Sequence, residues 1–125
     1  MHPLNWSAGW LLILASFLVG AVLGLFFHRD DFLGGYQSFP RRLMRLGHIA
    51  LAALGMMNVL YALSPWPAAG DWMSSAASAC FVAGGIAMPA ICFLSAWHRP
   101  FRHLFAFPVI ALVTAVVLTC IGGMS

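Results

Sequence analysis

The segment Pro40–Asn58, PRRLMRLGHIALAALGMMN, places a cluster of positive charge directly before a long apolar run. Three arginines and a histidine fall within its first nine residues, and no charged residue follows up to Asn58. The chain holds six basic residues, all of them arginine, so half of its permanent positive charge lies in this stretch. Such an abrupt change of polarity is typical of the point where a helix enters a membrane.

The composition of the whole chain indicates the same environment. Hydrophobic residues make up 62% of the sequence and charged residues 7%, and the mean hydropathy is +0.93. In a soluble domain about a quarter of the residues are charged. The length of 125 residues leaves room for several spans of about 20 residues each, but not for a soluble domain beside them.

Four apolar runs divide the chain, and we expect spans at about residues 8–28, 41–63, 72–97 and 101–122. The runs are continuously apolar, which favours helices over the alternating strands of a membrane barrel. The segments between them are short and rich in glycine, proline and charge, so neighbouring helices should run antiparallel. The sequence therefore predicts an all-α integral membrane protein. Its single domain, residues 1–125, should hold four transmembrane helices in an antiparallel up-down bundle.

The positions of the arginines predict an orientation. In a four-span protein, the first and third connections share one side of the membrane, and every arginine lies in or beside one of them. By the positive-inside rule this side faces the cytoplasm, which leaves both termini outside, as expected in a bacterial cytoplasmic (inner) membrane. Anionic lipid is the expected partner of this face. The six residues are Arg29, Arg41, Arg42, Arg45, Arg99 and Arg102. Six arginines in two short loops form no phosphate-tracking stripe, so we expect no nucleic-acid partner.

Small and polar residues within the spans predict how the helices pack. Helices in lipid associate through close contact of small side chains and through hydrogen bonds between helices. The side-chain amide of Asn58 needs such a partner, for which Thr114 or a carbonyl freed by Pro89 is expected. The predicted helix-packing residues are Ser16, Gly20, Gly24, Gly55, Asn58, Gly84, Pro89 and Thr114.

The third predicted span is the richest in small residues, so we expect it to be the most enclosed. Its small residues form two rows at helical spacing. These rows are Ala76, Cys80 and Gly84, and Ser75, Ala79, Ala83 and Ala87.

Histidine is the residue type that offers chemistry. At about 100° per residue, His48 shares a small, partly polar face with Gly55 and Asn58, and His103 shares a face with Thr114. If both faces point inward, His48 and His103 could ligate a b-type haem, or a metal, from two sides. Arg41, Arg42 and Arg102 could then pair with the haem propionates or, without haem, with lipid headgroups. The alternative is that histidines beside arginine simply lie at the membrane interface. His28 and His98 are assigned to the interface.

The residues that are missing narrow the function. The chain has no lysine for a Schiff base and no glutamate for a Glu-x-x-His di-iron site. Its three cysteines have no metal-binding spacing, and none of its three aspartates falls in the middle of a predicted span. No catalytic residue is predicted, and we expect the protein not to be an enzyme.

Three functional hypotheses follow. The leading one is a small non-catalytic membrane protein that serves as an accessory or assembly subunit of a larger membrane complex, through a membrane protein partner or as a homo-oligomer. The alternative is an electron carrier with haem between His48 and His103. The third is a small-molecule transporter that works through the third and fourth helices.

Overall fold

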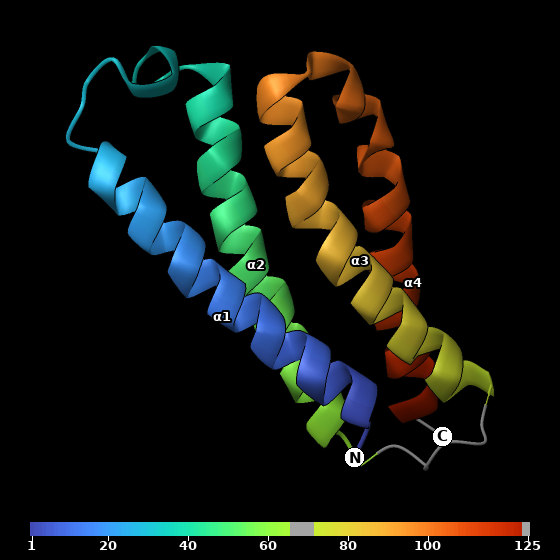
Figure 1. Ribbon diagram of the computed structural model, residues 1–125. Coiled ribbons are helices and arrows are strands. Elements are labelled where there is room, and N and C mark those ends of the chain that lie inside the picture. The colour runs from blue at the N-terminus through green and yellow to red at the C-terminus, as the bar shows by residue number, and fades with distance from the viewer. Residues whose placement is uncertain (66–71, 124–125) are drawn as a thin grey trace.

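The computed structural model of the protein describes residues 1–65 and 72–123, and these are helical throughout apart from turns (Figure 1). Within these described residues, four helices are long and apolar enough to cross a membrane, as predicted. The α-helices are α1 (Pro3–Phe26), α2 (Phe39–Leu63), α3 (Trp72–Trp97) and α4 (Ala106–Gly123), and the 3-10 helices are η1 (Phe32–Gly34) and η2 (Arg99–Phe105). Residues 66–71, within the predicted connection between the second and third spans, and residues 124–125 lie outside the described part.

Three helices start at residues other than those predicted. In each case a proline in the first turn or a 3-10 helix lies at the start. Helix α1 starts at Pro3 instead of about residue 8, because proline in the first turn lacks only an N–H that would have no partner there. Helix α2 starts after Ser38, whose Oγ accepts a hydrogen bond from the backbone N–H of Arg41 at 3.3 Å. The predicted fourth span starts as η2, and its α-helix begins only at Ala106.

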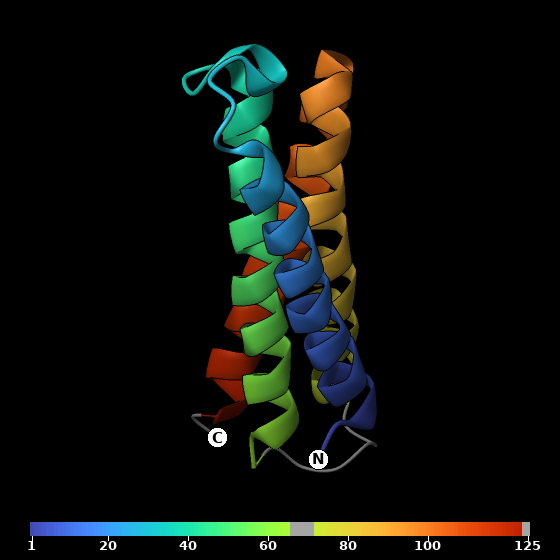
Figure 2. The same cartoon turned by 60° about the vertical axis from the view of Figure 1, so that its left-hand side comes forward.

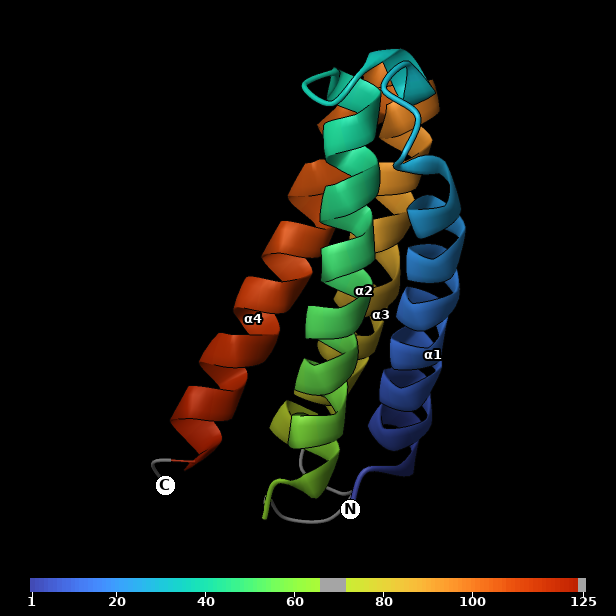
Figure 3. The ribbon, with the colours of Figure 1, turned by 90° about the vertical axis from the view of Figure 1, so that its left-hand side faces the viewer.

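The helices do not close into a compact ring. Helices α2 and α3 lie side by side in the middle, α1 packs on α2 and to a smaller extent on α3, and α4 packs mainly on α3. Figures 2 and 3 show α4 and α1 on opposite sides of this central pair. Helix α3 is the most enclosed of the four, as predicted, and α4 is the least. Among residues 1–65 and 72–123, one long face of α4 is therefore left without a partner.

Backbone contact between α1 and α2 depends on Gly9 and Gly55. A Cβ atom added to Gly9 would lie 2.6 Å from Cγ2 of Val59 and 2.8 Å from the carbonyl oxygen of Gly55. A Cβ atom on Gly55 would lie 2.9 Å from the carbonyl oxygen of Gly9. Only glycine permits this approach at both positions. Gly20 and Gly24 form a GxxxG pattern on α1, but Gly24 faces open space, so this pattern does not form the centre of the contact.

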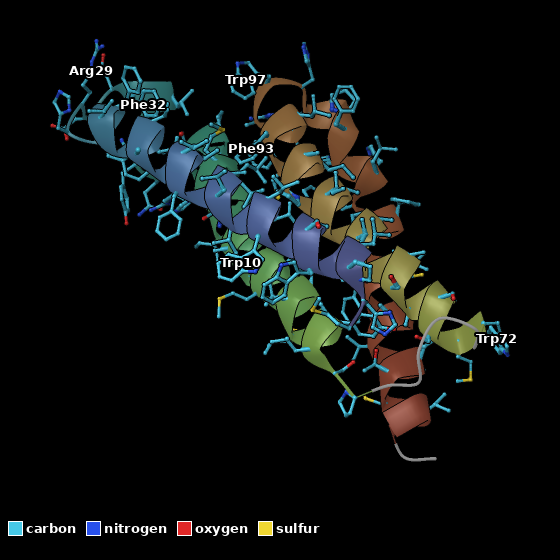
Figure 4. All side chains as sticks on the ribbon, turned by 60° about the horizontal axis from the view of Figure 1, so that its bottom comes forward. Trp10, Arg29, Phe32, Trp72, Phe93 and Trp97 are labelled. Carbon is cyan, nitrogen blue, oxygen red and sulfur yellow. The ribbon has the colours of Figure 1, made fainter. Side chains whose placement is uncertain are left out.

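The two ends of the molecule differ in composition. The connections that contain η1 and η2 lie at one end, and the start of α1 and the last turns of α4 lie at the other (Figure 1). Figure 4 shows Arg29, Phe32 and Trp97 towards the first end and Trp72 towards the second. All six arginines belong to η2, the first two turns of α2 or the segment after α1, and we call this end the arginine end.

Candidate functional site

Buried polar side chains join three helices far from the arginine end. Nδ2 of Asn5, on α1, donates to Oδ1 of Asn58 on α2 at 2.9 Å. Nδ2 of Asn58 donates to the Phe81 carbonyl on α3 at 3.2 Å and to the Leu54 carbonyl at 2.9 Å. Oγ of Ser78 donates to Oδ1 of Asn5, whose Nδ2 also lies 3.3 Å from the Ser78 carbonyl oxygen. Both asparagines are fully buried, and their polar atoms are satisfied by the protein itself.

A second polar group extends this network towards the N-terminus. The hydroxyl of Tyr61 donates to the Ser74 carbonyl at 2.8 Å, and Oγ of Ser74 lies 3.4 Å from Nε2 of His2. The ring of His2 packs on the ring of Tyr61 with a centroid distance of 4.9 Å. These contacts tie the first residues of the chain to α2 and α3, which indicates a structural role.

The expected partners of Asn58 were wrong. Thr114 is exposed on α4, and the carbonyl that Pro89 leaves without its helical donor belongs to Gly85, whereas Asn58 bonds to Phe81 and Leu54. The true partner, Asn5, was overlooked because the first span was expected to start at about residue 8. Pro3 was the available signal, since proline is favoured at the first position of a helix.

His48 lies against α1. Its Nδ1 is 3.5 Å from Oγ of Ser16, and the same hydroxyl donates to the His48 backbone carbonyl at 3.4 Å. A Cβ atom on Gly20 would lie 2.7 Å from Cε1 of His48, so the ring occupies the space that the glycine leaves free. Ser16 is buried and His48 is partly buried. The ring borders a hollow of about 480 Å³ between α1 and α2, lined also by Ile13, Phe17, Ala21, Ala52 and Met56.

His103 has different surroundings. It is exposed in η2, at the arginine end, and Thr114 is exposed as well. The predicted common face of these two residues assumed a continuous α-helix, but a 3-10 helix turns about 120° per residue instead of about 100°. The structure does not bring His48 and His103 together across the bundle, because His48 packs on α1 and His103 lies on the surface. Haem at these residues stays a prediction without support from their geometry.

The Arg41 side chain forms its hydrogen bonds with the connection after α1. It is 3% exposed, and its guanidinium donates to the carbonyls of Phe27 at 3.0 Å and Arg29 at 3.3 Å. The same group lies 4.9 Å from the ring centroid of Phe27 and 5.5 Å from that of Tyr36. Arg41 therefore satisfies carbonyl groups where α1 ends, which leaves it poorly placed for an external anion.

The other two predicted anion-binding arginines, Arg42 and Arg102, are exposed at the arginine end. Their exposure is compatible with contact to lipid headgroups, which is the role predicted for them in a protein without haem. Arg45 and Arg99 lie over aromatic rings, 4.3 Å from the centroid of Tyr36 and 5.4 Å from that of Phe39. Aromatic contact of this kind holds a guanidinium close to the protein surface.

The predicted packing residues divide into used and unused positions. Gly55 and Asn58 lie in the contacts described above, and Ser16 and Gly20 hold His48. Gly84 is buried against α4, where an added Cβ atom would lie 2.6 Å from Cγ of Leu112 and 3.4 Å from the Pro108 carbonyl oxygen. Pro89 is fully buried. Gly24 and Thr114 are exposed, so neither packs another helix within the described chain.

Within residues 1–65 and 72–123, no three or more His, Cys, Asp or Glu side chains are grouped so that they could hold a metal ion. Comparison with protein-family models, with curated proteins and with solved structures found no match to this chain.

Proposed function

We propose that the protein is a small non-catalytic membrane protein that serves as an accessory or assembly subunit of a larger membrane complex. The observation that supports this proposal is an uncovered row of small side chains on α3. Ser75, Ala79 and Ala83 are exposed, whereas Gly84 in the neighbouring row is buried against α4. Small residues permit the close approach by which helices associate in lipid, and within the described part of the chain only one of the two rows has its partner.

The polar groups support a structural rather than a catalytic role. The buried asparagines and serines of the network are used by one another and by backbone carbonyls, and Arg41 is used by the segment after α1. Apart from Nε of Arg41, which has no partner among the described residues, the polar atoms of these groups are paired, so they hold helices in register and leave little capacity for a substrate.

The proposed setting is a bacterial cytoplasmic membrane, with the helices in an antiparallel up-down bundle and both termini outside. The arginine end would then face the cytoplasm, as the positive-inside rule requires. Arg42 and Arg102, both exposed, would meet anionic lipid headgroups there. A membrane protein partner or a second copy would cover the uncovered row of α3.

Co-purification from native membrane in a mild detergent tests the subunit role. We expect the tagged protein to carry partner chains in fixed proportion, and Ala79→Leu or Ala83→Leu to release them. Ala53→Leu is the matched control, because Ala53 is an exposed alanine of α2. A monodisperse monomer from native membrane, or loss of partners with the control as well, would refute this role for α3.

A further inference from the structure

We propose that the hollow beside His48 binds an uncharged, lipid-soluble aromatic molecule that carries a ring hydroxyl, as quinols and phenols do. This site is independent of the subunit role, because it lies between α1 and α2 and the uncovered row lies on α3. Three observations support it: the position of His48 on α2 beyond the arginines, the free hydrogen-bonding capacity of its ring, and the shape and lining of the hollow.

His48 lies on the apolar side of the arginines of α2. It follows Arg45, the last of these arginines, by three residues, which corresponds to about 4.5 Å along the helix. On α1, Gly20 precedes the helix end at Phe26 by six residues, or about 9 Å. The hydrocarbon of a bilayer offers no water to an imidazole, so a polar ring at this position is expected to have a functional partner.

The hydrogen bonds of Ser16 bear on whether the free ring nitrogen of His48 is a donor or an acceptor. Oγ of Ser16 lies 3.4 Å from the His48 carbonyl oxygen and 3.5 Å from Nδ1 of the ring, and its single hydrogen can be donated to only one of them. We assign that hydrogen to the carbonyl oxygen and the ring hydrogen to Nδ1, which makes Nε2 an acceptor. Among the residues that the structure describes, none forms a hydrogen bond with Nε2. The site therefore favours a ligand with a donor, such as a hydroxyl group, over a ligand with a carbonyl alone.

The hollow fits a ring of modest size. Its volume of about 480 Å³ lies within the range of small-molecule sites, and its walls are apolar apart from Ser16 and His48. Phe17 and Met56, both largely exposed, border the hollow on the outer surface, where a molecule dissolved in lipid could enter. Aromatic and thioether side chains both make favourable contacts with an aromatic ring.

Equilibrium partition between nanodiscs that contain the full chain and empty nanodiscs tests the site. The probes are decylubiquinol, kept reduced under argon, decylubiquinone, and the dimethyl ether of decylubiquinol, which lacks the donor hydrogens. We expect decylubiquinol to bind about tenfold more tightly than the other two, the effect of one additional hydrogen bond in a largely apolar site. Equal binding of all three probes would mean that the hollow accepts any apolar chain, including a lipid tail, and would overturn the proposal.

Three variants locate the binding. His48→Phe keeps a ring of similar volume and removes the acceptor, so decylubiquinol should bind as weakly as its ether. Gly20→Leu fills the hollow, because even a Cβ atom there meets the His48 ring, and it should abolish binding of all three probes. Gly24→Leu is the matched control, one turn further along α1 and in open space, and should bind like the unmodified protein.

Undiminished binding by His48→Phe or by a folded Gly20→Leu would overturn the assignment. Circular dichroism and gel filtration establish folding. If Gly20→Leu does not fold, His48→Phe decides the question, since it leaves the glycine contact intact.

Discussion

The side-chain nitrogen of Asn5 lies 2.9 Å from the side-chain oxygen of Asn58, and this hydrogen bond joins α1 to α2 between two fully buried residues. Because Asn58 also donates to the Phe81 carbonyl, one amide connects three helices. Lipid tails compete with apolar side chains for helix surfaces, but they cannot replace a hydrogen bond. This pair therefore fixes the relative position of α1, α2 and α3 in a way that apolar contact alone would not.

Asn58→Leu should lower the free energy of unfolding by about 1–3 kcal/mol, because it removes two interhelical bonds and leaves Asn5 without its main acceptor. Unfolding in mixed micelles, followed by circular dichroism, measures the change. Thr119→Val is the control, since Oγ1 of Thr119 donates only to the Ala115 carbonyl of its own helix. Equal losses for both variants would contradict the role of the pair.

Gly55→Ala should separate α1 from α2 and lower stability by about 1–3 kcal/mol, because the new methyl group would lie 2.9 Å from the Gly9 carbonyl oxygen and 2.8 Å from Cγ1 of Ile13. Backbone atoms cannot move aside as a flexible side chain can. The same unfolding measurement on Gly24→Ala should show no loss, since nothing lies within 4 Å of that position. If Gly24→Ala lowered the free energy of unfolding as much, the loss would follow from replacing any glycine of these helices and not from the contact between Gly9 and Gly55.

Arg41→Leu should loosen the segment between α1 and α2, because the Phe27 carbonyl loses the guanidinium donor and the Arg29 carbonyl keeps only its bond from the Phe32 N–H. Hydrogen–deuterium exchange at residues 27–38 should become faster while exchange within α3 stays unchanged. Arg42→Leu removes the same charge from an exposed position and should leave exchange in this segment unchanged. Arg41→Lys should restore little, since an ammonium group cannot reproduce the planar, multi-donor contact. Equal acceleration by the Arg41 and Arg42 variants would show that charge, not geometry, orders the segment.

The orientation is tested with a reporter enzyme that is active only outside the cytoplasm. In the proposed orientation the arginine end lies inside, so a fusion after the last residue should be active and a fusion within residues 28–38 should be inactive. Exchanging Arg42 and Arg45 for Gln should lower the activity of the first fusion by mixing the two orientations. An active reporter in residues 28–38 of the unmodified protein would reverse the proposed orientation.

The haem hypothesis predicts a Soret band in protein purified from cells with ample haem, lost in both His48→Ala and His103→Ala. The structure places these histidines in different surroundings, so we expect colourless protein from the unmodified chain. Absorption spectroscopy of the detergent-purified protein measures this. A band that disappears in both variants would mean that the helices rearrange around haem.

Much of the fold could be predicted from the sequence because hydropathy alone identifies spans in a membrane protein. The third span, predicted at about residues 72–97, corresponds to α3, whose ends are tryptophans at the limits of the apolar run. The fourth failed at its start, where η2 precedes the α-helix. No sequence pattern in Arg99–Phe105 distinguishes a 3-10 helix from an α-helix. The helix face predicted for His103 was wrong for this reason, because it assumed a continuous α-helix.

The candidate site was harder to predict. Which side chains form hydrogen bonds between helices depends on how far each helix is shifted along its axis relative to its neighbours, and a single sequence does not encode this shift. Asn58 was expected to need a hydrogen-bonding partner, but Asn5 lies 53 residues away on a helix whose start had been placed too late. Arg41 was assigned to lipid or haem by its charge, yet the turn after α1 brings two carbonyls to its guanidinium. His48 was assigned an inward face, and it packs on α1 because Gly20 leaves room for its ring.

The position of α4, which packs mainly on α3, has a consequence for biosynthesis. Every residue that joins the first three helices through the asparagine network precedes α4 in the chain, so that network can close while the ribosome is still making the last helix. A chain interrupted after η2 should already hold its first three helices together, and the final helix would then dock onto a finished surface.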